Sequence, residues 1–358
     1  MTGAGSGLRD GSEAGGAARG RDVADGWLDE IPVRRLLEDD LATRFPLPPG
    51  DRPLVEPGAV VLPGDPLLEH LRDRRIDEVD VHVGEGARPV PGSRWAPAPG
   101  RRHRDREIEG ELLAPVPGKS DRWRLVTGDH RVILQSPVAG VVTEVRPGAE
   151  IRVRPDGRAL RAAFAAGSAA RGRLELATDP FGELRPGGID VGRAGSILVV
   201  GSRIDAEALT RARAMGVRGI VVASLPGKEL RDFQASERRQ RAGLHAMVPF
   251  GVLALEGALR RPIPSVIGEL LERFEGREVA LLVDPPALVF EANGDAAPEL
   301  VPDRVRIRSG PNAGAEGRVL GLVGPRRFAS GVVLEAARVA IDGEDVVDVP
   351  LGDLERFA

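Results

Sequence analysis

The chain has 358 residues, more than a single hydrophobic core usually fills, so two to four domains are expected. Its apolar content of 42% supports globular folding, and a net charge of −4 argues against general polyanion binding. The absence of cysteine excludes disulfides, thiolate metal sites and cysteine nucleophiles. No apolar run approaches the roughly 20 residues of a membrane span, and the N-terminus lacks a signal-peptide core. We therefore expect a cytoplasmic protein.

Two kinds of sequence precede the first β-rich region. Residues 1–25 are rich in Gly, Ala and Ser without periodicity, which predicts a flexible tail. Residues 27–41 carry apolar side chains at helical spacing, and Pro32 suits a first helical turn. The spaced residues are Val33, Leu36, Leu37 and Leu41. This spacing predicts a short amphipathic helix.

Two separated segments share a β texture. Residues 47–68 contain short apolar runs broken by Pro-Gly and Gly-Asp turns, and residues 132–148 contain Ser-Pro-Val-Ala-Gly-Val-Val. Together they resemble the two halves of a barrel-sandwich hybrid, the fold of biotinyl and lipoyl domains. Those families carry their cofactor on a lysine, for which Lys119 is the nearby candidate. Lys119 lacks both the flanking methionines of a biotin site and the acidic neighbour of a lipoyl site.

The resemblance therefore implies a structural barrel without a bound cofactor. Residues 86–110, between the two halves, carry four prolines and many arginines and are expected to form an exposed loop. Further strands extend this β domain over residues 26–180.

Residues 190–292 alternate between apolar strands and amphipathic helices. Strands are expected over 196–200, 219–223, within 247–255, and over 278–283. Helices are expected over 205–215, 226–243 and 265–274, the first with Asp205 as its N-cap. This alternation predicts a small parallel sheet with right-handed crossovers.

The C-terminal region, residues 298–358, contains the most distinctive motif. Val305 and Ile307 alternate with arginines at 304, 306 and 308, which predicts a strand with one buried and one wet face. A turn follows in which Gly310 and Gly314 can adopt positive φ. The segment resembles the KOW motif of NusG-type transcription factors and certain ribosomal proteins, which opens an SH3-like barrel. Gly317 matches the motif's glycine, whereas Ala315 stands where many members have lysine. Residues 347–355 resemble the closing strand of such barrels.

The resemblance implies a partner in transcription or translation, either protein or RNA. The candidate partner-binding residues are Arg304, Arg306, Arg308, Asn312, Arg318, Arg326 and Arg327. Residues 302–330 hold six arginines against two acids, whereas residues 331–358 hold two arginines against seven acids. This polarity, together with an aromatic content of 3%, favours protein docking as much as phosphate binding.

Evidence for catalysis is weak. The turn after residues 196–200 has one glycine and matches neither a dinucleotide fingerprint nor a Walker loop. Ser202 and Arg203 remain candidates for binding an anion at the next helix N-terminus. The histidines lack metal-ligand spacing, and the Asp129-His130 pair near Ser136 has no nucleophile elbow. The basic run 237–241 is a solvated helix face or a docking strip.

The predicted fold is multidomain and mainly β plus α/β. It comprises a split barrel-sandwich hybrid, a small parallel α/β sheet and a C-terminal SH3-like β-barrel. The module order resembles a group of uncharacterised bacterial proteins, which implies a layout but no activity. We expect a non-enzymatic adaptor without metal or cofactor. The alternatives are an enzyme or sensor binding a nucleotide-like ligand at the α/β domain, and an envelope-complex adaptor.

Overall fold

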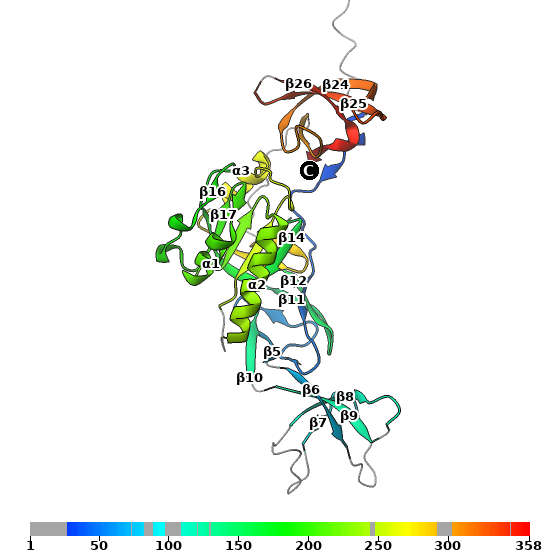
Figure 1. The fold of residues 1–358 in the computed structure, drawn as a ribbon, viewed down its shortest axis with the longest axis vertical. Coiled ribbons are helices and arrows are strands. Elements are labelled where there is room, and N and C mark those ends of the chain that lie inside the picture. The colour runs from blue at the N-terminus through cyan, green and yellow to red at the C-terminus, as the bar shows by residue number, and fades with distance from the viewer. Residues whose placement is uncertain are drawn as a thin grey trace, which may run out of the picture. The chain divides into compact units, whose positions relative to one another are not determined.

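The computed structural model describes residues 27–72, 74–81, 89–96, 109–119, 121–128, 130–243, 248–291, 303–343 and 345–358. The chain forms two compact units, one joining Met1–Arg35 to Glu299–Ala358 and the other comprising Leu36–Pro298 (Figure 1). The fold is mainly β, with three α-helices in the described residues. None of these helices is long and apolar enough to cross a membrane. The predicted tail, residues 1–25, lies outside the described residues.

The larger unit begins with two small antiparallel sheets, ordered β10-β5-β3 and β2-β12-β11-β4. Their strands are β2 (Thr43–Pro46), β3 (Arg52–Pro53), β4 (Val60–Val61), β5 (Pro66–Arg72), β10 (His130–Gln135), β11 (Gly140–Arg146) and β12 (Glu150–Pro155). The two segments expected to form one β domain, residues 47–68 and 132–148, are hydrogen-bonded to one another, since β5 pairs with β10 and β4 with β11. Phe45, Val142 and Val153 lie in their shared core.

Between these segments the chain forms a separate sheet, ordered β6-β9-β8-β7. Its strands are β6 (Arg75–Asp80), β7 (Arg94–Trp95), β8 (Gly110–Pro115) and β9 (Arg122–Thr127). Leu112, Trp123 and Leu125 are buried in a core of its own. Most of the loop expected over residues 86–110 lies outside the described residues, although β7 falls within it.

An eight-stranded sheet follows, ordered β13-β22-β21-β15-β17-β19-β20-β14. Its strands are β13 (Gly157–Arg161), β14 (Phe164–Gly167), β15 (Ala170–Leu176), β17 (Ser196–Val200), β19 (Gly219–Val222), β20 (Gly251–Ala254), β21 (Glu278–Val283) and β22 (Pro286–Glu291). Strands β15, β17, β19 and β20 are mutually parallel, whereas the flanking pairs are antiparallel. Three of the four strands expected in a parallel sheet, β17, β19 and β20, are parallel here, but the fourth expected strand, β21, is antiparallel to its neighbours. The fourth parallel strand is β15, which was expected in the preceding β domain, so the parallel strands form the centre of a larger mixed sheet.

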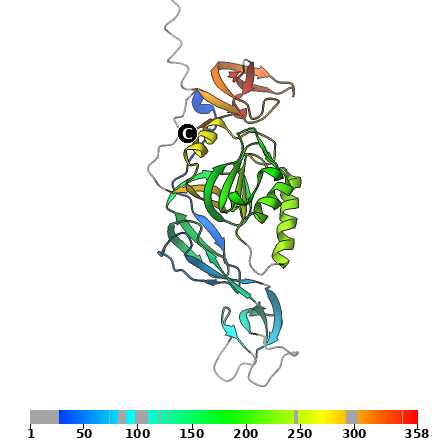
Figure 2. The same ribbon diagram turned by 90° about the vertical axis from the view of Figure 1, so that its left-hand side faces the viewer.

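The three helices match their predicted positions: α1 (Ala206–Ala214), α2 (Gly227–Gly243) and α3 (Ser265–Arg273). Asp205 caps α1 by accepting a hydrogen bond from Ala208 N at 2.7 Å. Leu209 of α1 and Phe233 of α2 are buried in one core with alternate residues of β17 and β19, so both helices cover the same sheet face. Figure 2 shows α2 in yellow-green along one side of the sheet.

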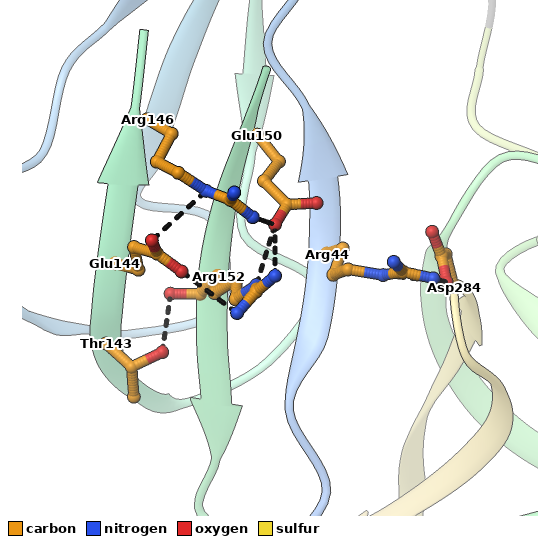
Figure 3. A network of polar contacts seen from close by, with 7 residues as sticks. All are labelled: Arg44, Thr143, Glu144, Arg146, Glu150, Arg152 and Asp284. Atoms are coloured by element: carbon orange, nitrogen blue, oxygen red, sulfur yellow. Dashed lines mark hydrogen bonds and ion pairs between the residues drawn. The ribbon is translucent and has the colours of Figure 1, made fainter.

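The eight-stranded sheet also packs against the sheet β2-β12-β11-β4 through a shared apolar core. Ala280, Leu282 and Val289 share a core with the β2 and β12 side chains. At its edge, Arg44 Nη2 lies 2.5 Å from Asp284 Oδ1. Figure 3 shows this pair beside a second group of ion pairs on β11 and β12. That group consists of Glu144, Arg146, Glu150 and Arg152. Exposed pairs each contribute up to about 1 kcal/mol, so apolar burial is the stronger attachment.

The smaller unit is a six-stranded sheet, ordered β1-β27-β23-β24-β25-β26. Its strands are β1 (Val33–Arg34), β23 (Arg304–Ile307), β24 (Glu316–Arg327), β25 (Val333–Ile341), β26 (Val346–Pro350) and β27 (Leu354–Phe357). The closing segment expected over 347–355 is thus divided between β26 and β27 by the 3₁₀ turn Leu351–Asp353.

The predicted helix over residues 27–41 is wrong. The chain forms a 3₁₀ turn at Trp27–Glu30, and β1 then pairs in parallel with β27. Ile31 is buried in the core of the smaller unit, whereas Leu41 is buried in the core of the larger one. Residues 31–41 therefore serve two separate cores, which an extended chain accommodates and one continuous helical face does not.

The prediction that the arginine face of β23 is exposed to solvent is also wrong at its central residue, Arg306. Arg306 is buried, with its side chain 1% exposed, and its Nη1 lies 3.3 Å from Glu355 Oε1. β23 lies between β24 and β27, and Glu355 stands directly opposite Arg306 in the neighbouring strand. Burial of an ion pair is tolerated when the partners lie in register in this way.

Replacing Arg306 with Ala should destabilise the smaller unit by about 3 kcal/mol, because within the described chain it leaves the largely buried Glu355 carboxylate with only Arg308, whose Nε lies 4.0 Å away. Urea unfolding of the full chain, followed by hydrogen exchange in residues 303–358, measures the loss. Arg318→Ala is the matched control, since Arg318 is exposed and pairs with Asp303. Equal effects of the two substitutions would contradict the buried pair's role.

Candidate functional site

The candidate surface of the smaller unit is a hairpin formed by residues 320–334, where β24 ends and β25 begins (Figure 1). We call it the distal hairpin. β24 and β25 pair as far as Arg327 opposite Val333. β26 pairs with β25 only as far as Ala336. Within the described chain, residues 325–327 and 333–335 thus pair only with one another. A two-stranded ribbon of this kind is marginally stable in water.

The distal hairpin exposes large apolar side chains. Leu320 and Val333 are each 56% exposed. The complete set is Leu320, Leu322, Val332, Val333 and Leu334. Single exposed apolar residues are ordinary, but several on one short hairpin mark a candidate interaction region. Because side chains alternate along a strand, Val333 and Leu334 lie on opposite faces of the hairpin.

Next to these apolar groups, two arginines share one carboxylate. Arg338 Nε lies 2.9 Å from Asp348 Oδ1, and Arg326 Nε lies 3.3 Å from Asp348 Oδ2. The hydrogen bond from Arg338 holds the pKa of Asp348 below its ordinary value, so the carboxylate is ionised at neutral pH. The Arg326–Asp348–Arg338 triad therefore carries a net charge of about +1.

The triad and two apolar residues share one sheet face. Leu334 stands directly opposite Arg326, and Arg338 stands opposite Asp348. Val346 precedes Asp348 by two residues on the same strand and is exposed. Because side chains alternate along a strand, these residues point to the same side. We define Arg326, Leu334, Arg338, Val346 and Asp348 as the outer face.

Most of the other candidate arginines are already neutralised. The pairs are Arg304 with Glu316 and Asp342, Arg308 with Glu355, and Arg318 with Asp303, at 2.6 to 4.0 Å. Arg327 is exposed and has no ion pair to another described residue. Asn312 is exposed in the turn, where its carbonyl accepts from Ala315 N. The basic strand face suggested by sequence is thus largely an internal network of charges.

The glycines between β23 and the start of β24 have structural roles. Gly310 and Gly314 adopt φ of +85° and +94°, a region that favours glycine. A Cβ on Gly317 would lie 2.2 Å from the carbonyl oxygen of Ala340. Gly317 therefore permits close approach of β25 to β24.

The candidate anion site at the start of α1 is occupied by the protein itself. Ser202 Oγ donates to the carbonyl oxygen of Phe181 at 2.8 Å. Arg203 Nη2 lies 3.7 Å from Glu229 Oε1, and Glu229 Oε2 accepts from Ala206 N at 3.0 Å. With Asp205 as the cap, two carboxylates already satisfy the first turn of α1. An added anion would compete with both.

The glycine that precedes Ser202 has a similar explanation. A Cβ on Gly201 would lie 2.1 Å from the carbonyl oxygen of Asp179, and Thr178 Oγ1 accepts from Gly201 N at 2.8 Å. The loop after β15 therefore fills the space that a phosphate would occupy in a nucleotide-binding turn.

A polar cluster that sequence reasoning missed lies around Asp51, whose side chain is fully buried. Its carboxylate accepts from Leu71 N at 2.9 Å and Arg74 Nη2 at 2.5 Å, and lies 2.7 Å from His70 Nδ1. Nearby, burial raises the pKa of Glu111 despite the surrounding arginines. Sequence spacing gives little signal for this cluster, because Asp51, His70 and Glu111 lie on three strands or their ends. The cluster fixes the chain where β5 leads toward the inserted sheet.

The remaining sequence candidates have ordinary positions. Lys119 lies in the turn between β8 and β9, outside the two barrel-like segments. Ser136 is buried, and its Oγ donates to Val138 O at 2.7 Å. The described residues contain no group of three or more His, Asp or Glu placed to hold a metal ion. His82, His103, Asp129 and His245 lie outside the described residues.

No protein-family model matches the sequence, and no curated protein matches it.

Replacing Gly201 with Ala should destabilise the larger unit by roughly 1–3 kcal/mol, because the added methyl meets the Asp179 backbone. Gly187→Ala is the control, since its Cβ would meet no atom within 4 Å. Thermal unfolding of both variants gives the comparison. If Gly201→Ala leaves the unfolding temperature unchanged, the turn has room for an added group, and it becomes a candidate ligand site again.

Proposed function

We propose that the protein is a non-enzymatic adaptor whose smaller unit docks on a protein of the transcription or translation machinery. The observation that carries this proposal is the exposure of five large apolar residues on the distal hairpin, at the edge of a unit with its own core. The KOW-like sequence of residues 303–320 directs the choice of machinery.

The charge distribution supports protein rather than RNA as the partner. Arg304, Arg306 and Arg318 have carboxylate partners within the unit. A phosphate would have to displace those carboxylates, whereas apolar docking leaves them in place. Residues 331–358 also carry more acids than bases, which repels a polyanion.

The nucleotide-sensor alternative gains no support from the geometry at α1. Ser202 and Arg203 already have partners within the chain, and the loop after β15 approaches Gly201 closely. The larger unit is therefore proposed as a scaffold for the docking unit.

A sedimentation assay with purified bacterial ribosomes, and a pull-down with purified RNA polymerase, test this function. We expect one of the two to retain the full chain. Replacing Leu320 and Leu334 with Ser should reduce retention at least about tenfold, because two exposed leucines contribute about 1–3 kcal/mol on burial. Retention should persist at 0.5 M salt, since apolar contacts are not screened.

Ile133→Ser is the matched control, because Ile133 is an exposed apolar residue of the larger unit. It should leave retention unchanged. Retention by neither assembly would overturn the proposal. Retention that ribonuclease or moderate salt abolishes would instead assign the surface to RNA.

A further inference from the structure

We propose that the outer face binds a partner segment in which a carboxylate is flanked by large apolar side chains. This inference rests on the proposed docking function and specifies the chemistry of the partner. It concerns Arg326, Leu334, Arg338, Val346 and Asp348, as defined above.

The charge of the triad is the first argument. Arg326 and Arg338 present ten N–H donors between them, whereas Asp348 offers one carboxylate. The arginine side chains are 50% and 46% exposed, so donors remain accessible to a partner. One added carboxylate brings the cluster to about neutral and makes charge-assisted hydrogen bonds.

The apolar surroundings are the second argument. Leu334 lies opposite Arg326, and Val346 lies along β26 from Asp348, so both flank the triad on the same face. Contact with apolar partner side chains would exclude water from the new ion pair and strengthen it. A polyphosphate chain finds neither several unpaired cations nor stacking rings here.

The irregular backbone of β24 indicates how the partner binds. Its outer edge beyond Val319 has no strand partner within the described chain, yet register shifts occur before Gly321 and Gly324, and Pro325 follows. Bulges and proline are the usual devices that prevent addition of another strand at an edge. The partner therefore contacts the side chains of the outer face instead of extending the sheet.

Fluorescence anisotropy on the full-length protein tests this inference. The probe is a labelled soluble peptide with the core Leu-Glu-Leu-Glu-Leu, compared with its Leu-Gln and Leu-Lys counterparts and with a 12-nucleotide RNA. We expect the Glu peptide to bind about tenfold or more tightly than the Gln peptide. The Lys peptide and the RNA should bind more weakly still.

Two variants identify the residues responsible, and a third serves as the control. Arg326→Gln should reduce binding of the Glu peptide to the level of the Gln peptide, and Leu334→Ser should weaken both. Arg94→Gln is the control, because Arg94 is an exposed arginine paired with Glu109 in the larger unit. It should change neither affinity, and thermal unfolding verifies that each variant is folded.

Equal binding of the Glu and Gln peptides, binding of none of the peptides, or tighter binding of the RNA would overturn the inference. Concentration-dependent dimerisation that Leu334→Ser abolishes would also overturn it, by assigning the face to a second copy. Each outcome is separable from the adaptor function, because retention on ribosomes or RNA polymerase is measured independently.

Discussion

The buried ion pair between Arg306 and Glu355 is the constraint on which the smaller unit depends. It places a guanidinium in the middle of the sheet and requires β27 to lie beside β23. Because β27 also pairs with β1, the same arrangement brings residues 33–34 into a sheet formed mostly by the C-terminus. An arginine that the sequence suggested for a partner is thus buried in the sheet and paired within the chain.

Other arginines of this segment also have carboxylate partners within the smaller unit. Arg304 and Arg318 pair with carboxylates on or beside neighbouring strands, so the basic face expected from alternation is largely neutral. What remains available is the distal hairpin, with its exposed leucines and valines, and the triad around Asp348. The surface left over after internal pairing is therefore suited to a protein with both apolar and acidic groups.

Local sequence rules predicted the elements whose causes are local. Asp205 caps α1 because its side chain reaches an N–H three residues on, and α3 follows its amphipathic spacing. The errors arise where the decisive partner is distant in sequence. Arg306 was expected on an exposed strand face because its partner, Glu355, is 49 residues away in the sequence. Residues 31–41 were expected to be helical because the sequence does not reveal that this segment contributes to two different cores. Strands β13 to β15 were assigned to the wrong sheet for the same reason, since neither apolar pattern nor length specifies a neighbour.

The candidate surface was only partly predictable. Arg326 stood out as a charge, but its neighbours Leu334 and Asp348 are brought together by pairing across three strands. Hydrogen exchange of the full chain, with and without the retaining assembly, tests the central claim most directly. The account predicts protection concentrated in residues 320–338 and 346–348. Protection confined to the start of α1, or to the larger unit, would contradict it.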